Sequence, residues 1–438
     1  MDESLPVVVI GAGPQGLAAA AHLVERGEEV VVLEAGEGVA SAVAEWGHVR
    51  LFSEWRELVD SASARLLAPT GWVAPQSGYP TGSQWIASYL KPLADVLGDR
   101  IRYGSRVTGV SRRGRDRLVD AGRGEQPFTV HVDSMDGEYR MRARAVIDAS
   151  GTWQSPNPAG ADGLPALGER AASERLTYRI PDFRRASEFA GAHTVVIGSG
   201  HSAITAVLAL ARIARRDPST KVTWALRRAT AANAFGGGDA DELPARGALG
   251  IRAKELVDAG LVNLVTGFRV ERISEESDGV VLGAEDGRML TADRVVVLTG
   301  FRPDHSFLSE LCLELDATLQ APVHIAAEVD PNIHSCGSVA ATGAADLAHP
   351  EPGFYMVGAK SYGRAPTFLA LTGYEQVRSV VAELVGDHEA AQRVELVLPD
   401  TGVCGGAGLF DASGASLGGA CFAPPAQTLQ IGRAPASV

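Results

Sequence analysis

The sequence predicts an α/β fold made of two parallel-sheet units, the second inserted into the first. Two glycine-rich boxes carry this prediction, because each follows a hydrophobic strand and precedes a stretch typical of a helix. Two later strands, over 145–148 and 294–298, each end in a turn of small residues, which indicates that each closes one unit. At 438 residues, 45% of them hydrophobic, the chain is long enough for two or three domains around a large core.

The first box follows the strand 7–10 and reads Gly11-Ala12-Gly13-Pro14-Gln15-Gly16. Its first glycine permits a tight turn, its second lets backbone approach a pyrophosphate, and its third packs a helix against the strand. A helix is expected over 17–26, and then a strand over 29–33 that ends at Glu34 and Ala35. An acid about 20 residues after such a box binds a ribose 2′-hydroxyl. The first unit is therefore predicted to be Rossmann-like and to bind FAD or NAD through these residues, and a nucleotide with a 2′-phosphate is disfavoured there.

The second box follows the strand 194–197 and reads Gly198-Ser199-Gly200-His201-Ser202-Ala203. The next strand, 221–226, ends in Arg227 and Arg228 where the first unit has an acid. A guanidinium there binds a 2′-phosphate bidentately, although two arginines on a loop are also compatible with simple solvation. We therefore expect NADPH at the second unit, held by Gly198, Gly200, His201, Ser202 and the two arginines.

Composition excludes several classes of function. The net charge of −13 disfavours nucleic acid as a partner. No run of 18 apolar residues indicates a membrane span, and the acidic start, Met1-Asp2-Glu3-Ser4, is unlike a signal peptide. The four cysteines form no C-x-x-C pair, so the close dithiol of a disulfide reductase is not predicted, although a pair distant in sequence stays open. These features favour a cytoplasmic enzyme whose partners are small molecules, with a homodimer left open.

The order of patterns predicts the domains. We expect an FAD-binding domain in two parts, 1–155 and 301–390, a connector over 156–192, an NADPH-binding domain over 193–300, and a Gly/Ala/Pro-rich tail over 391–438. A helix is expected over 85–97 with Ser83 as its N-cap, and another over 369–384 that ends before Gly386. The arginines between Arg112 and Arg123 are interpreted as a solvated hairpin tip.

Two further motifs accompany the boxes. They are Ala149-Ser150-Gly151-Thr152-Trp153, followed by Pro156 and Pro158, and Leu298-Thr299-Gly300-Phe301-Arg302-Pro303-Asp304. With them, residues 5–385 resemble the flavin-containing monooxygenases, a group that includes bacterial N-hydroxylases and Baeyer–Villiger enzymes. The resemblance implies FAD at the first box, NADPH at the second, and interdomain crossings at Ala149, Ser150 and Gly151 and at Thr299 and Gly300. It also implies that NADPH reduces the flavin, O2 adds at flavin C4a, and the (hydro)peroxyflavin oxygenates a small nucleophilic substrate at S, N or a carbonyl.

Three departures from that family keep an alternative open. The connector over 168–173 lacks the family's histidine, Ser53-Glu54 stands where some members have an asparagine beside the flavin, and Gly358-Ala359-Lys360 replaces a Gly-Asp pair. The alternative is an FAD-dependent NAD(P)H oxidoreductase that inserts no oxygen and acts on thiols or metalloids. A nucleotide-sensing flavoprotein without catalysis is a third reading.

The segment 358–366 also resembles bacterial flavoproteins associated with arsenic-resistance gene clusters. That resemblance would give the tail cysteines, Cys404 and Cys421, a function, because soft metalloids prefer thiolates. The alternative is that both are tail cysteines without a role. No metal site is predicted.

Lys360 is the candidate catalytic residue, because it follows the glycine turn at Gly358 that is expected to approach the flavin. A cation near flavin N1 would stabilise the anionic reduced flavin; the alternative is a surface lysine. The other residues expected at the cofactors are Trp46, Phe52, Ser53 and Val107. Core packing is the alternative for the aromatic rings.

Overall fold

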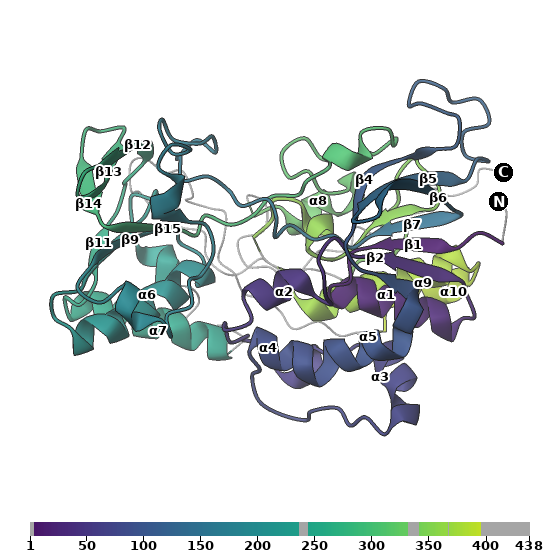
Figure 1. Cartoon of the computed structure of the whole chain (residues 1–438), viewed down its shortest axis with the longest axis horizontal. Coiled ribbons are helices and arrows are strands. Elements are labelled where there is room, and N and C mark those ends of the chain that lie inside the picture. The colour runs from purple at the N-terminus through teal and green to yellow at the C-terminus, as the bar shows by residue number, and fades with distance from the viewer. Residues whose placement is uncertain (1–3, 236–243, 332–340, 367, 396–438) are drawn as a thin grey trace, which may run out of the picture.

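The computed structural model describes residues 4–235, 244–331, 341–366 and 368–395. These residues form two lobes, each built on a five-stranded sheet whose strand pairs are all parallel (Figure 1). The predicted α/β class with two Rossmann-like units is confirmed.

The first lobe contains the first box and the strand near the end of the described chain. Its sheet has the order β16 (Phe354–Met356), β7 (Ala145–Asp148), β1 (Val7–Ile10), β2 (Val30–Leu33) and β3 (Ile101–Arg102). Successive side chains of a strand point to opposite faces, so Val7 and Val9 pack towards the helices. Val8 and Ile10 instead pack against a second, antiparallel sheet. The sheet is thus covered on both faces, as parallel sheets require.

The antiparallel sheet of this lobe contains β4 (Ser105–Arg112), β5 (Phe128–Ser134) and β6 (Gly137–Ala143). On the opposite face lie α1 (Pro14–Glu25) and α9 (Ala370–Leu384), which pack against each other. The other helices of the lobe are α2 (Ser41–Glu45), α3 (Ser61–Leu67), α4 (Gly82–Trp85), α5 (Lys91–Leu97), α8 (Val323–Val329) and α10 (His388–Gln392). A buried His22–Asp60 pair, with Nε2 and Oδ1 3.0 Å apart, joins α1 to the N-cap of α3.

The second lobe repeats this plan. Its sheet has the order β11 (Asn263–Val265), β10 (Lys221–Ala225), β9 (His193–Ile197), β15 (Arg294–Val297) and β8 (Leu176–Thr177). Val196 faces the helices α6 (His201–Arg216) and α7 (Pro244–Asp258). Val195 and Ile197 face the antiparallel sheet of β12 (Val270–Glu276), β13 (Gly279–Ala284) and β14 (Met289–Ala292). The segment 156–192, expected to be a connector, contributes β8 to this sheet.

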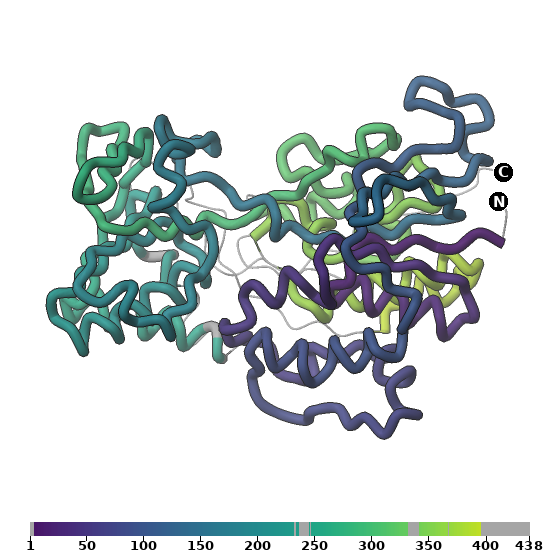
Figure 2. Tube along the Cα trace, viewed as in Figure 1, coloured from purple at the N-terminus to yellow at the C-terminus, as the bar shows by residue number. Residues whose placement is uncertain are grey.

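The chain passes twice between the lobes, and the two crossings pair with each other (Figure 2). Asn157 N donates to Gly300 O at 2.9 Å, and Arg302 N donates to Ser155 O at 2.9 Å. The Asn157 amide also donates to Thr299 O at 3.1 Å. The crossings thus form a short antiparallel ribbon that joins the two lobes.

Two local predictions are wrong. The helix expected over 85–97 begins at Gly82, because the Thr81 hydroxyl and the Gln84 side chain form a capping box; Ser83 is not the cap. A π-helical turn, Ile86–Leu90, then precedes α5.

The solvated hairpin tip is wrong at its two ends, because Arg112 and Arg123 are buried, whereas Arg113 and Arg117 between them are exposed. Arg112 Nε lies 2.6 Å from Glu351 Oε1, and Arg123 Nη2 lies 2.9 Å from Glu351 Oε2. A buried carboxylate 228 or more residues away in sequence therefore fixes both ends of this segment. In the described part of the chain, no helix combines the length and apolarity needed to cross a bilayer.

Candidate functional site

A cavity of about 1080 Å³ lies at the carboxyl ends of the strands and is lined by residues of both lobes. Gly11, Glu34, Ala149 and Gly358 line it where strands of the first sheet end, and Leu298 lines it directly after β15. Ligands of open parallel sheets bind in this position. The two predicted units therefore share one cavity.

Most of the residues predicted to bind FAD line this cavity, together with one residue of the second box. They are Gly11, Gly13, Pro14, Gln15, Glu34, Ala35, Trp46, Phe52, Ser53, Val107, Ala149, Ser150, Gly151, Gly358 and, from the second box, Ser202. Trp85 also lines the cavity, whereas Trp55 packs in the core of the first lobe.

The glycines of the boxes differ in what an added Cβ would meet. At Gly16 a Cβ would lie 1.8 Å from Gly11 O, and at Gly198 it would lie 2.1 Å from Leu298 O. Gly11 and Gly198 also have positive φ angles, 98° and 127°. At Gly13 and Gly200, in contrast, a Cβ would have no protein atom within 4 Å. The first and third positions thus serve packing, and the second position faces space that a pyrophosphate fits.

The helices after the boxes present their N-termini to that space. No side chain of Gly13 or Gly200 can cap α1 or α6, and both helices direct the positive ends of their dipoles at that space, which favours an anion there. The buried Glu34 carboxylate accepts from Ala12 N at 2.7 Å and from Gly36 N at 2.8 Å. A carboxylate has about four acceptor positions, so capacity for a ribose hydroxyl remains.

Gln15 supplies a further polar group to the first site. Its side chain is buried against Gly358 and Gly373, and its Nε2 donates to Ala370 O at 3.0 Å. Its Oε1 has no hydrogen-bond partner among the described residues and belongs to a side chain that lines the cavity. The donor set and the glycine cradle therefore fit a dinucleotide.

Lys360 lies behind the cavity wall and not on the surface. Its ammonium is fully buried, with Nζ 2.6 Å from Asp148 Oδ2 and 3.2 Å from Ser150 Oγ. The ring of Phe307 lies 4.3 Å from Nζ. Burial lowers the pKa of the neighbouring His305, and the Lys360 charge lowers it further. The expected cation is thus present, but it is paired with Asp148, and it does not line the cavity, whereas its neighbour Ser150 does.

The remaining predicted residues do not line the cavity. They either pack a helix against a strand within a box or belong to the second unit. They are Gly16, Gly198, Gly200, His201, Arg227, Arg228, Thr299 and Gly300. Arg227 is exposed and its Nη1 donates to Ala161 O at 2.7 Å, whereas Arg228 is half-buried. Protein atoms around the guanidinium groups partly desolvate them, and this desolvation and a neighbouring arginine lower the pKa of both.

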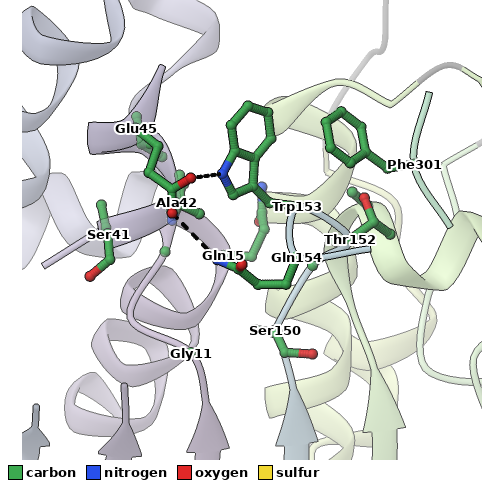
Figure 3. A pocket seen from close by; sticks show the side chains of 18 of the residues that line it. Gly11, Gln15, Ser41, Ala42, Glu45, Ser150, Thr152, Trp153, Gln154 and Phe301 are labelled. Atoms are coloured by element: carbon green, nitrogen blue, oxygen red, sulfur yellow. Dashed lines mark hydrogen bonds between the residues drawn. The ribbon is translucent and has the colours of Figure 1, made fainter. Parts of the chain in front are cut away.

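Several cavity residues were not assigned from the sequence, and four of them form one group. Glu45 ends α2, Arg179 lies in the connector, and Trp153 and Phe301 belong to the two crossings. The Trp153 and Phe301 rings stack with centroids 4.9 Å apart, and Figure 3 shows Glu45 beside Trp153. The repeated strand-then-glycine form of the two crossings was the signal that could have identified the two aromatic residues, since each follows that glycine closely.

The described residues include one of the four cysteines. Cys312 is half-buried and does not line the cavity, whereas Cys404 and Cys421 lie outside the described residues. Within the described ranges, no group of three or more His, Cys, Asp or Glu side chains is arranged to hold a metal ion.

The family model described as pyridine nucleotide-disulphide oxidoreductase matches residues 8–332. The chain belongs to this family. It is therefore an oxidoreductase, and its cofactors are the flavin and nicotinamide dinucleotides that the two boxes predict.

Two curated relatives match part of the chain. An indole-3-pyruvate monooxygenase of Oryza sativa subsp. japonica is 30% identical over 206 residues, which cover 47% of this chain and 45% of the relative. The thiamine thiazole synthase of Archaeoglobus fulgidus is 28% identical over 182 residues, which cover 40% of this chain and 67% of that enzyme. The chain thus matches about half to two-thirds of the length of these relatives.

Solved structures support the fold. The bacillithiol disulfide reductase of Bacillus cereus superimposes with a TM-score of 0.65 at 19% identity, covering 86% of this chain and 99% of that one. A flavin-containing monooxygenase of Stenotrophomonas maltophilia superimposes with a TM-score of 0.55 at 22% identity, covering 87% and 99%. The similarity to the flavin-containing monooxygenases inferred from the motifs is confirmed.

Proposed function

We propose that the protein is a monooxygenase that uses NADPH and O2 to oxygenate a small nucleophilic substrate at sulfur, nitrogen or a carbonyl. The observation that supports this proposal is the single cavity lined both by Gly13 of the first box and by Ser202 of the second. Two nucleotides that extend from their boxes into one cavity meet without an intermediate carrier. Bound FAD supplies the two-electron chemistry and the activation of oxygen.

The chain's own residues bind and orient the cofactors. The uncapped N-terminus of α1 and the open side of Gly13 hold the FAD pyrophosphate, and Glu34 accepts a hydrogen bond from the ribose. At the second unit, α6 holds the nicotinamide dinucleotide, and Arg227 and Arg228 follow β10 where its 2′-phosphate would lie. Two charge-assisted contacts at that point favour NADPH over NADH.

The aromatic lining excludes water from the reacting centre. Rings from both crossings and from the first lobe line the cavity: Trp46, Phe52, Trp85, Trp153, Phe301 and Phe307. A dry site protects an activated oxygen species from loss to water and strengthens each polar contact. The buried Asp148–Lys360 pair orients Ser150 N and Ser150 Oγ at the edge of this lining.

An NADPH oxidase or reductase that inserts no oxygen is the second candidate. The buried Ser53 lines the cavity where some flavin-containing monooxygenases have an asparagine, and this observation favours the alternative. Among the described residues, a dithiol reductase receives no such support, since Cys312 does not line the cavity and the other three cysteines lie outside them. The two candidates differ in where the electrons of NADPH go.

The test reduces the purified flavoprotein with NADPH under argon and then mixes it with O2. We expect a long-lived absorbing species, and methyl phenyl sulfide or trimethylamine should receive one atom of isotopically heavy O2. Hydrogen peroxide should then account for only part of the NADPH consumed. Prompt recovery of all NADPH electrons as peroxide, with every probe, would establish the oxidase alternative.

A further inference from the structure

A segment of the first lobe, residues 45–52, contacts the rest of the molecule across the cavity in three places. The first contact is made by Glu45 at the end of α2 (Figure 3). Its Oε2 accepts from Trp153 Nε1 at 2.9 Å, and its Oε1 accepts from Gln154 Nε2 at 3.5 Å. Arg179 Nε lies 3.1 Å from the same Oε2. One carboxylate of the first lobe therefore joins the first crossing and the connector.

Trp153 extends this contact to the second crossing. One neighbour of its ring is the Phe301 ring, with centroids 4.9 Å apart and planes at 29°; another is the Arg179 guanidinium, 5.0 Å from the ring centroid. Arg179 Nη2 also donates to Trp153 O at 3.3 Å. Glu45, Trp153, Arg179 and Phe301 thus form one cluster, and all four line the cavity.

The second and third contacts lie further along the segment. His48 Nε2 lies 3.1 Å from Ile180 O, next to the arginine that pairs with Glu45. The Phe52 ring packs on the His201 ring, with centroids 5.7 Å apart. His201 is the first residue of α6, so Phe52 lies at the N-terminus to which the second box directs an anion. The segment 45–52, which we call the strap, therefore connects the first lobe to both the connector and the second box.

The contacts of the strap across the cavity are weak enough for the strap to open and close. The Glu45 and Arg179 side chains keep 42% and 35% of their surface exposed, and exposed ion pairs contribute little free energy. The crossing ribbon, with backbone hydrogen bonds in both directions, keeps the lobes joined when the strap is released. The closed strap nevertheless places Phe52 against His201, the residue before Ser202, where a nucleotide would enter the shared cavity from the second box.

We propose that the strap is a gate for the pyridine nucleotide, which Glu45 keeps closed through Arg179. NADP(H) binding requires the strap to leave the N-terminus of α6, so the closed strap weakens binding by the free energy of its own contacts. Glu45 is then a positioning residue that acts on the nucleotide through the strap. This inference rests on the proposed second nucleotide site.

The test compares Glu45→Gln with Glu25→Gln. Glu25 forms a matched control pair, because Arg65 Nη2 lies 2.9 Å from its Oε2, both side chains are partly exposed, and neither lines the cavity. The readouts are NADP⁺ affinity by titration calorimetry and hydrogen exchange of the connector around 176–182. In Glu45→Gln we expect the NADP⁺ Kd to fall about two- to fivefold and the connector to exchange faster. Glu25→Gln should change neither quantity.

A double-mutant cycle separates the gate from a general loss of structure. Arg179→Met should reproduce the lower Kd, and Glu45→Gln combined with Arg179→Met should lower it no further, because both changes release the same contact. An unchanged or higher Kd in Glu45→Gln overturns the proposal. If the parent protein binds no NADP⁺, the proposed second nucleotide site is wrong. Hydrogen exchange of the connector then shows by itself whether Glu45 holds the strap against the connector.

Discussion

Replacing Gly13 and Gly16 one at a time separates FAD binding from folding within one box. A Cβ at Gly16 would lie 1.8 Å from Gly11 O and must move by about 1.2 Å to reach even the 3.0 Å that real Cβ atoms keep. Because that oxygen belongs to the backbone, Gly16→Ala should cost about 1–3 kcal/mol or more of unfolding free energy, with or without flavin. At Gly13, a Cβ has no protein atom within 4 Å, and φ is −78° with ψ at −177°, which any residue adopts.

Gly13→Val should therefore leave the unfolding free energy of the flavin-free protein within about 1 kcal/mol of the parent. It should weaken FAD binding at least about tenfold, because the new side chain occupies the place of the pyrophosphate. The assay measures the FAD-to-protein ratio after purification and urea unfolding of flavin-stripped samples. A Gly13→Val protein that keeps the parent's FAD affinity would refute the assignment of the first box.

Three further outcomes follow from the site and its surroundings. Replacing both Arg227 and Arg228 by Ala should raise KM for NADPH about tenfold or more per arginine, because a charge-assisted contact contributes about 1.5–3 kcal/mol. KM for NADH should change little. Equal KM values for NADH and NADPH in the parent protein would contradict this. Lys360→Met leaves the Asp148 carboxylate buried without its partner, so thermal unfolding should show a loss of about 3–5 kcal/mol that Asp148→Asn in the same chain largely restores. Burial raises the pKa of Asp60, but its imidazole partner and its hydrogen bonds lower it below the usual value on balance. A carboxyl whose pKa is lower in the folded state stabilises the protein above its unfolded pKa, so the unfolding free energy should fall below about pH 4. It should fall less in Asp60→Asn. If the urea midpoints of the parent and of Asp60→Asn instead fall in parallel in acid, this pair does not supply the pH dependence.

The parts of the fold that were predicted are those encoded by contiguous residues. The strand, turn and helix of each box lie within about 20 residues of one another, so the parallel units and the position of Glu34 could be predicted from local spacing. The two crossings were legible for the same reason, because strand and glycine turn are adjacent in sequence. The close backbone neighbours of Gly11 and Gly198 exclude a larger residue at either position. Turns that require glycine in this way are the easiest to predict from sequence.

The parts that were missed depend on partners distant in the chain. Lys360 meets Asp148 across 212 residues, and Arg112 meets Glu351 across 239. No periodicity or spacing reports such a pairing, so Lys360 was expected to face the flavin directly and Arg112 to face solvent. The Glu45 contact was missed because it depends on how the crossings place Trp153.

The central claim is that the two nucleotides meet in one cavity and exchange a hydride directly. Rapid mixing of the FAD-loaded protein with NADPH under argon tests it, with NADPH deuterated at nicotinamide C4 as the comparison. We predict loss of the oxidised-flavin absorbance in a step that deuterium slows. Flavin that stays oxidised in saturating NADPH would contradict the claim.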